Sequence, residues 1–153
     1  MKNIFITGVS RGLGLEIVKT LLDKDYIIYG ISREKSESIK ELEVQYGERI
    51  KFYSFDIANI EYISSKLFKE FIPLNIPISG FVNNAAYAYD DIITNANYNV
   101  LKKSFDINFF GPVLLTKYII RNMLFNNIKG SIVHISSISV HTGYKGLSMY
   151  AAS

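Results

Sequence analysis

Short apolar runs alternate along this chain with longer segments in which apolar residues recur at every third or fourth position. Five runs have the length of a buried strand and cover residues 4–6, 26–31, 50–55, 78–82 and 131–135. The segments between them have helical spacing and cover residues 13–22, 35–46, 59–71 and 98–125. The pattern therefore predicts strands and helices that alternate from the first residues to about residue 135.

Single residues indicate how some of these helices begin and pack. In the first helix the spacing groups five apolar residues on one face: Leu13, Ile17, Val18, Leu21 and Leu22. Asn59 stands where an N-cap is needed and is expected to begin the third helix. Pro112 lies inside the long fourth helix and has no N–H group, so the helix should kink and leave the Asn108 carbonyl free to hold a water molecule.

This alternation predicts a Rossmann-type α/β fold, a doubly wound parallel sheet covered by helices on both faces. Right-handed crossovers give its five strands the order 3-2-1-4-5. No shift in composition marks a second domain, so residues 1–153 are expected to form one domain. Ligands of such sheets bind outside the carboxyl ends of the strands. Five candidate residues fall at these ends: Gly8, Arg33, Asp56, Asn83 and Ser137.

Composition narrows the classes of function. The 153 residues are 48% hydrophobic, and their formal charge of +3 is spread along the chain, which argues against a nucleic-acid partner. There is no Cys, and neither His134 nor His141 has a second ligand at helical spacing, so no metal site is expected. No apolar run approaches the ~18 residues of a membrane span and no signal peptide is evident, so we expect a cytoplasmic protein without a membrane partner.

The stretch Thr7–Gly14 lies between the first predicted strand and the first predicted helix. A glycine-rich loop at this junction presents free backbone N–H groups and the positive end of a helix dipole to an anion. A nucleotide pyrophosphate is the natural ligand. The alternative is a turn that only lets the strand and the helix pack closely. Three glycines within seven residues favour phosphate binding.

The end of the second predicted strand indicates which dinucleotide the chain binds. NAD usually meets an acidic residue there, but this chain has Ser32 and Arg33, with no acid before Glu34. Arg11 in the glycine loop is a second cation near the same place. A guanidinium pairs well with a 2′-phosphate, so the sequence predicts NADP(H) in preference to NAD(H). The alternative is that both arginines are merely solvated surface residues.

Four motifs, in order along the whole chain, resemble the classical short-chain dehydrogenase/reductase family. Thr7–Gly14 is similar to its TGxxxGxG cofactor loop, and Asn83–Ala86 to its NNAG motif, with Ala86 in place of glycine. Ser137 and Tyr150 are thirteen residues apart, like its catalytic Ser and Tyr, and Tyr150–Ser153 resembles the start of YxxxK. Within the family, the 3-oxoacyl-(acyl-carrier-protein) reductase group looks nearest.

The resemblance implies a set of cofactor-binding residues. Asp56 with the Ile57 backbone would contact the adenine, and Asn83 with Ala85 would line the central stretch of the cofactor. The exchange at Ala86 matters only if its backbone needs a positive φ. Together with Arg11, Ser32 and Arg33, which charge and position indicate, the candidate cofactor-binding residues are Gly8, Ser10, Arg11, Gly12, Leu13, Gly14, Ser32, Arg33, Asp56, Ile57, Asn83, Asn84, Ala85 and Ala86.

The resemblance also implies the catalytic residues of a carbonyl reductase. Tyr150 would donate a proton to the carbonyl oxygen, Ser137 would hydrogen-bond the same oxygen, and Asn108 would hold a water of the proton relay. A free tyrosine has a pKa of about 10, and a neighbouring cation lowers it toward the useful range. In the family this cation is a lysine four residues after the tyrosine, at position 154, just past Ser153. The alternative for Asn108 is a helix residue beside an incidental kink.

A complete family member continues for roughly another hundred residues. We therefore expect residues 1–153 to be the N-terminal part of a longer protein, with an exposed edge at residues 131–135. The resemblance implies a small-molecule carbonyl or acyl-thioester substrate and a homo-oligomer, a dimer or tetramer, at full length. Two other hypotheses stay open for the chain as it stands: a non-catalytic nucleotide-binding module, and a protein that pairs with a partner through its edge strand.

Overall fold

The computed structural model describes all 153 residues. Its five strands are β1 (Asn3–Thr7), β2 (Ile27–Ser32), β3 (Ile50–Ser54), β4 (Ile78–Asn83) and β5 (Ser131–His134). The α-helices are α1 (Gly12–Leu22), α2 (Glu37–Tyr46), α3 (Tyr98–Phe105), α4 (Gly111–Phe125) and α5 (Ser148–Ala152). Two π-helical segments are η3 (Ile63–Phe71) and η5 (Asp106–Phe110). Short 3₁₀ turns are η1 (Gly47–Arg49), η2 (Ile60–Tyr62), η4 (Ile93–Asn95) and η6 (Ile138–Val140).

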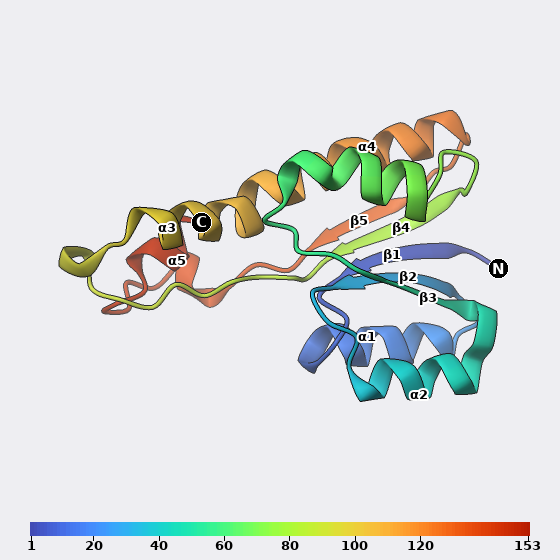
Figure 1. Cartoon of the computed structure of the whole chain (residues 1–153), viewed down its shortest axis with the longest axis horizontal. Helices are drawn as coiled ribbons and strands as arrows, with labels where there is room; N and C mark the ends of the chain where they lie inside the picture. The colour runs from blue at the N-terminus through green and yellow to red at the C-terminus, as the bar shows by residue number, and fades with distance from the viewer.

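The strands form one parallel sheet in the order β3-β2-β1-β4-β5, which confirms the predicted Rossmann-type topology. Figure 1 shows α1 and α2 on one face of this sheet and η3 with α4 on the other. The chain crosses from the first face to the second after β3, so the central strand β1 lies between two layers of helices. Such a sheet opens a crevice at the carboxyl ends of its central strands.

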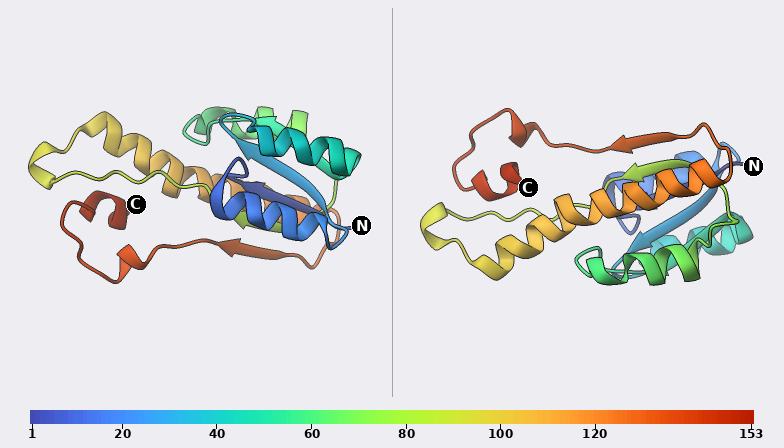
Figure 2. Two further views of the ribbon diagram at one scale, coloured as in Figure 1. Left: turned by 90° about the horizontal axis from the view of Figure 1, so that it is seen from below. Right: turned by 90° about the horizontal axis from the view of Figure 1, so that it is seen from above.

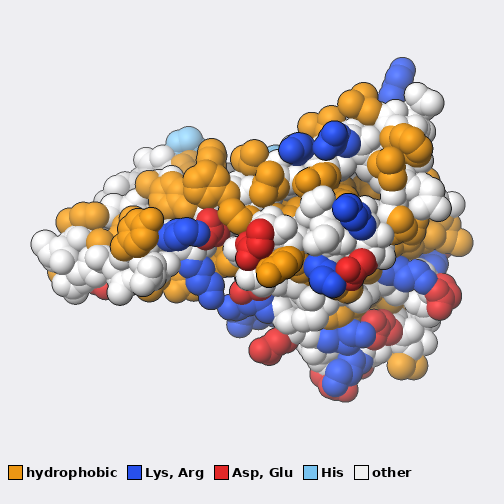
Figure 3. Space-filling view, turned by 45° about the horizontal axis from the view of Figure 1, so that its top comes forward, with side chains coloured by type: hydrophobic (Ala, Val, Ile, Leu, Met, Phe, Trp, Pro, Cys, Tyr) orange, Lys and Arg blue, Asp and Glu red, His pale blue; other side chains and the backbone are white.

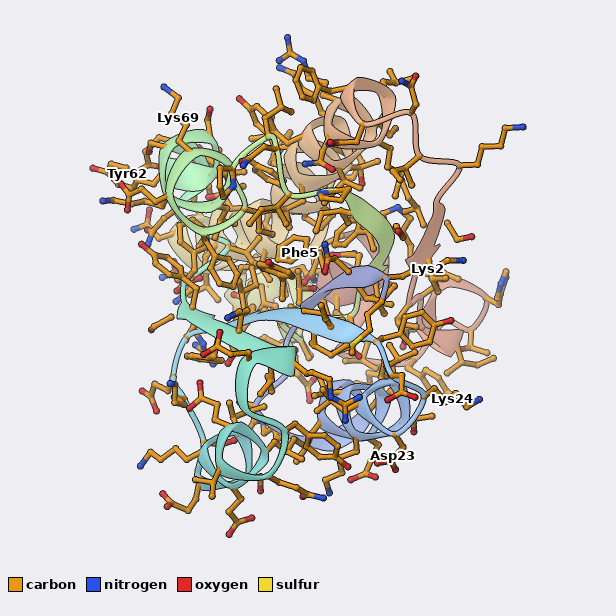
Figure 4. All side chains as sticks on the ribbon, turned by 90° about the vertical axis from the view of Figure 1, so that its right-hand side faces the viewer. Lys2, Phe5, Asp23, Lys24, Tyr62 and Lys69 are labelled. Atoms are coloured by element: carbon orange, nitrogen blue, oxygen red, sulfur yellow. The ribbon has the colours of Figure 1, made fainter.

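The core consists of two apolar layers, one on each face of the sheet. Phe5 of β1 lies in the layer beneath η3 and α4, where its ring stacks on Phe81 of β4 at 5.4 Å between centroids (Figure 4). Its neighbour Ile6 faces the other way and packs with Val18 and Ile28 in the layer beneath α1 and α2. Because successive strand residues point to opposite faces, β1 is buried on both sides and holds its carboxyl end rigidly.

Two expectations about helices are wrong. The buried face of α1 is Gly14, Leu15, Val18 and Leu22, whereas Leu13 is 56% exposed. Its place in the first turn puts Leu13 at the edge of the sheet, beside open space rather than core. Asn59 makes no side-chain cap, because the chain enters this helix through the 3₁₀ turn η2. The Asp56 carboxylate instead accepts a hydrogen bond from the Ala58 N–H at 3.0 Å.

The predicted long helix exists but is not uniform. It begins at the predicted residue, with the Asn97 side chain accepting hydrogen bonds from two N–H groups of the first turn. The π-helical η5 then separates α3 from α4, and the Gly111 N–H donates to the Asp106 carbonyl, five residues back. Pro112 lies in the first turn of α4. The departure from α-helical geometry just before Pro112 agrees with the expected disruption there.

Beyond the carboxyl edge of the sheet the chain forms an elongated projection that contains α3, the loop before it and α5 (Figures 1 and 2). The C-terminal residue lies in this projection, far from the N-terminus at the opposite end of the sheet. β5 pairs only with β4 and forms one edge of the sheet, with Val133 48% exposed, as expected for this strand. No helix is long and apolar enough to cross a membrane.

Candidate active site

The glycine loop uses its three glycines in different ways. Gly8 has φ +74°, and its N–H donates to the Ile31 carbonyl of β2 at 2.8 Å. Gly14 needs its hydrogen, because a Cβ there would overlap the Gly8 carbonyl oxygen and lie 2.6 Å from the Asn84 amide. Gly12 has φ +57°, yet a Cβ there would meet nothing within 4 Å. The loop is thus closely packed at both ends and open at Gly12, where α1 begins without a side-chain cap.

Side chains from two strands hold this loop in place. The buried Thr7 hydroxyl accepts hydrogen bonds from the N–H groups of Asn84 and Ala85, both at 3.0 Å. The Asn84 side-chain amide donates to the carbonyls of Thr7 at 3.0 Å and Gly8 at 3.2 Å. Thr7 is absent from the candidate residues inferred from the sequence. Its place at the start of the glycine motif is the signal that could have identified it.

A cleft of about 850 Å³ opens at the carboxyl ends of β1, β2 and β3. Thirteen of the fourteen candidate cofactor residues line it: Gly8, Ser10, Arg11, Gly12, Leu13, Gly14, Ser32, Arg33, Asp56, Ile57, Asn84, Ala85 and Ala86. Asn83 is the exception, because the alternation of β4 turns its buried side chain toward a second cavity. The cleft is also lined by Ile31, Glu34, Lys35, Ser36, Phe55, Tyr87 and Ile107, which the sequence did not single out.

Three cationic side chains are among the residues that line this cleft. Arg11 and Arg33 are exposed, and neither forms an ion pair. Lys35 is different, because Glu43 holds its ammonium group at 2.8 Å. The backbone beside Arg33 is fixed, since its carbonyl accepts a hydrogen bond from the Ser54 hydroxyl at 2.5 Å. The two arginines are therefore available to an anion in the cleft.

The residues present suit the pyrophosphate of a dinucleotide. The uncapped first turn of α1 leaves N–H groups directed at the cleft, and Gly12 leaves space beside them. The φ of Ala86 is not positive. Alanine therefore causes no backbone strain at this position, where the family motif has glycine. No group of three or more His, Cys, Asp or Glu that could hold a metal occurs in the chain.

A second cavity of about 450 Å³ adjoins the cleft, and Ala85 and Ala86 line both. All three candidate catalytic residues face it: Asn108 from η5, Ser137 from the loop after β5, and Tyr150 from α5. These residues are distant in sequence, yet the parallel sheet and the projection bring them to one space. The sequence-based candidates thus form two adjoining sites rather than a scattered set.

The Ser137 hydroxyl has a defined local environment. Its oxygen accepts a hydrogen bond from the Ser139 N–H at 3.2 Å, which caps the turn η6. As the oxygen acts as acceptor, its proton is free to be donated to another group. Tyr150 is half-buried and lies in α5, whose Ala151 also lines the cavity. A hydroxyl donor and a phenol therefore share one cavity.

Asn108 joins three segments of the projection. Its side-chain oxygen accepts from the Tyr87 N–H at 2.8 Å, and its amide donates to the Tyr87 carbonyl at 2.9 Å. The same amide donates to the Ser153 hydroxyl at 2.8 Å. Asn108 therefore fixes the strand-like segment after β4 and the end of α5 against η5.

An ion pair between an exposed lysine and a buried aspartate joins α3 to η5, the segment that carries Asn108. Asp106 is 6% exposed, and its carboxylate lies 2.6 Å from the Lys102 ammonium group, one helical turn earlier. This hydrogen bond raises the pKa of Lys102. The pair joins α3 to the π-helical segment and so helps to orient the element that carries Asn108.

Comparison with known proteins agrees with this geometry. The family model for short chain dehydrogenases matches residues 2–153. The chain is 29% identical to the L-xylulose reductase of Caenorhabditis elegans over 99% of its own length and 60% of that protein. It is 27% identical to the 3-oxoacyl-(acyl-carrier-protein) reductase of Chlamydia pneumoniae, over 99% of this chain and 61% of the relative. The chain thus spans about 60% of the length of these curated relatives.

A solved structure supports the fold independently. The 4-hydroxyisoleucine dehydrogenase complexed with NADH superposes with a TM-score of 0.90, covering 99% of this chain and 61% of the other, at 22% identity. That neighbour's structure holds NADH. Three findings agree. The parallel sheet has the order 3-2-1-4-5, the glycine loop opens on a cleft, and the family model matches almost every residue. This chain therefore belongs to the short-chain dehydrogenase/reductase family of oxidoreductases.

Proposed function

We propose that the full-length protein, of which residues 1–153 supply the nucleotide-binding domain, is an NADPH-dependent reductase of carbonyl compounds. One observation carries the proposal: Asn108, Ser137 and Tyr150 share a cavity that adjoins the glycine-loop cleft at Ala85 and Ala86. A nicotinamide at this junction would supply the hydride. A phenol and a serine hydroxyl are the groups that a reduced carbonyl oxygen needs beside it.

The proposed roles follow from what each group can donate. Tyr150 gives its proton to the carbonyl oxygen as negative charge develops there. Ser137 donates its free proton as a hydrogen bond to the same oxygen and so stabilises that charge. The Asn108 side chain hydrogen-bonds the Tyr87 backbone and the Ser153 hydroxyl and so holds these two segments in place. Its backbone carbonyl is proposed to hold a water of the proton relay. The reverse reaction, oxidation of a secondary alcohol, uses the same groups.

The preference for NADPH is supported by charge. Arg33 and Arg11 line the cleft without carboxylate partners, and β2 ends in Ser32 rather than in an acid. A 2′-phosphate gains charge-assisted hydrogen bonds from guanidinium groups, whereas a ribose hydroxyl gains little. We propose that these arginines hold the 2′-phosphate, with Ser10, Gly12, Leu13 and Gly14 around the pyrophosphate.

The cofactor proposal is tested by binding to the full-length protein. We expect tighter binding of NADPH than of NADH, and Arg33→Ala should weaken NADPH binding roughly 10- to 100-fold, because a hydrogen bond to a charged group is lost. NADH binding should be unaffected. Arg121→Ala, on the exposed surface of α4, is the control and should change neither affinity. Equal affinities for the two cofactors in the wild type would refute the preference.

The catalytic proposal is tested by Tyr150→Phe, which removes only the phenolic oxygen. The rate of NADPH oxidation with a carbonyl substrate should fall roughly 10²- to 10⁴-fold, since general acid catalysis is lost, while NADPH binding is retained. Tyr144→Phe, an exposed tyrosine in the preceding loop, is the matched control. Undiminished turnover by the Tyr150 variant would show that another group supplies the proton and would refute the role proposed for Tyr150.

We further propose a cytoplasmic homo-oligomer that acts on a small carbonyl or acyl-thioester substrate. Exposed apolar side chains support the oligomer: Phe109, Phe110, Val113, Ile120 and Leu124 leave a hydrophobic band along the α4 side of the molecule (Figure 3). Exposed apolar patches of this kind commonly mark interaction surfaces. Sedimentation of the full-length protein should show a dimer or tetramer.

A further inference from the structure

Lys35 lines the glycine-loop cleft, but its charged group is bound by partners outside the cleft. The ammonium nitrogen lies 2.8 and 2.9 Å from the two carboxylate oxygens of Glu43 and 5.2 Å from the centre of the Phe52 ring. Neither Glu43 nor Phe52 lines the cleft, whereas Lys35 and Arg33 both do. Lys35 is therefore a cation of the cleft whose charge is already compensated by a carboxylate.

The backbone on both sides of Lys35 is fixed. Before it, the Ser32 hydroxyl donates to the Glu34 carbonyl at 2.9 Å. After it, the Ser36 hydroxyl accepts a hydrogen bond from the Ile39 N–H at 3.4 Å and caps α2. The Lys35 side chain is 37% exposed and has a flexible stem. The ammonium group can therefore change partners while the backbone stays in place.

The ion pair between Lys35 and Glu43 is weak enough for such an exchange. The two side chains are 37% and 30% exposed, so water screens the attraction between them. A phosphate carries a larger negative charge than a carboxylate and offers three acceptor oxygens. A phosphate bound in the cleft therefore competes effectively with Glu43 for the ammonium group.

We propose that Lys35 joins Arg11 and Arg33 as a third cation of the 2′-phosphate site, and that Glu43 limits its contribution. In the free protein Glu43 compensates the charge of Lys35. On binding of a 2′-phosphate the ammonium group turns from Glu43 toward it. Glu43 thus lowers the affinity for the phosphorylated cofactor and sets the size of the preference. This inference rests on the proposed function, because it concerns the NADPH preference proposed for the same cleft.

Nucleotide fragments test the inference on the full-length protein without turnover. Adenosine 2′,5′-bisphosphate carries the 2′-phosphate, 5′-AMP lacks it, and titration calorimetry measures the affinity of each. Glu43→Gln should tighten binding of the bisphosphate roughly two- to fivefold, because Lys35 is released from a partly exposed ion pair. Lys35→Met should weaken it roughly three- to tenfold, because a charged hydrogen-bond donor is lost. Unchanged affinity for 5′-AMP in both variants shows that the cleft remains folded.

A double variant and a matched control separate the release of Lys35 from a general change of charge. Glu37→Gln removes a carboxylate from the same helix, where Glu37 pairs with Lys40 at 2.9 Å and neither residue lines the cleft. This control should change the bisphosphate affinity by less than about twofold. In a protein that already carries Lys35→Met, Glu43→Gln should have no more effect than the control, since Glu43 acts through Lys35.

The outcomes distinguish this inference from the proposed function. If the wild type binds the bisphosphate no more tightly than 5′-AMP, the proposed NADPH preference fails and the inference fails with it. If the wild type prefers the bisphosphate but Lys35→Met leaves that affinity unchanged, the preference stands and Lys35 has no part in it. If Glu43→Gln weakens binding or leaves it unchanged, Glu43 does not restrain Lys35 and the inference is wrong.

Discussion

At the scale of single residues, the packing of the glycine loop requires that residue 14 has a hydrogen in place of a side chain. Gly14 packs directly against the Gly8 carbonyl, and the Asn84 amide lies where any side chain of residue 14 would begin. The sequence predicts a phosphate loop from the spacing of its glycines. It does not reveal that Thr7 and Asn84 hold the loop through mutual hydrogen bonds, because these two residues are 77 positions apart in the sequence.

Gly14→Ala should destabilise the full-length protein by at least about 2 kcal/mol, because the new methyl group overlaps a backbone oxygen that cannot move freely. Urea unfolding measures this loss. Gly143→Ala is the control, since a Cβ there meets nothing within 4 Å and its φ is not positive; we expect a change within about 0.5 kcal/mol. Equal stability of the two variants would show that the loop has room at position 14.

At the scale of elements, the π-helical η5 is the clearest departure from regular structure. Pro112 predicts a disruption of the long helix, and the structure has one just before it. The sequence does not predict that the Asn108 side chain grips the Tyr87 backbone with two hydrogen bonds. That contact spans 21 residues and arises because the segment after β4 runs alongside the helix.

Strand β2 carries a tyrosine inside the core, and this residue makes the free energy of unfolding change with pH in the alkaline range. Burial raises the pKa of Tyr29 above its ordinary value near 10, against a smaller opposite effect of Lys51. The unfolded chain therefore loses this proton at a lower pH than the folded one. The free energy of unfolding should fall as the pH rises above about 10, through the raised pKa.

Tyr29→Phe tests this dependence, because it removes the titrating hydroxyl and leaves the ring. Unfolding of the full-length protein in urea between about pH 8 and 12 should show a shallower loss of stability in the variant than in the wild type. Phenolate absorbance would follow the ionisation directly. An identical pH profile for both proteins would mean that Tyr29 titrates alike in the folded and unfolded states.

At the scale of the whole molecule, two neighbouring sites differ in the charged side chains of this chain that line them. Arginines line the cleft and none lines the cavity, and Ala85 and Ala86 line both. This arrangement follows from topology, because the carboxyl ends of β1, β2 and β3 border the cleft while β4, β5 and α5 border the cavity. Figure 2 shows the segment after β5 running back toward the projection that carries α3.

The exposed edge strand β5 should cause copies of the 153-residue chain to associate with one another. Unpaired backbone groups beside Val133 and Ile135 form a template for another strand. Light scattering of this chain should increase with concentration, and Val133→Lys should reduce the association because a charge opposes edge pairing. Lys is better tolerated there than in the core, since Val133 is 48% exposed. Scattering independent of both concentration and the substitution would argue against association through this edge.

Much of the fold and the site was predictable from local pattern. Apolar periodicity determined the alternation of strands and helices, and the glycine spacing with Arg33 identified the cleft and its charge. Local pattern misplaced the apolar face of α1 at Leu13 and the cap at Asn59, because burial and cap geometry depend on neighbouring elements. Only the structure shows that Asn83, predicted with the cofactor residues, lines the adjoining cavity and not the cleft itself.

The sequence by itself determined which elements form and which residues are candidates for the chemistry, because helix and strand periodicity and the nature of a side chain are local properties. Tertiary structure alone decided that Asn108, Ser137 and Tyr150 face one cavity and that Thr7 and Asn84 clamp the glycine loop. The reason is physical. Contacts between residues dozens of positions apart depend on the packing of helices against a twisted sheet, and no short stretch of sequence contains that packing.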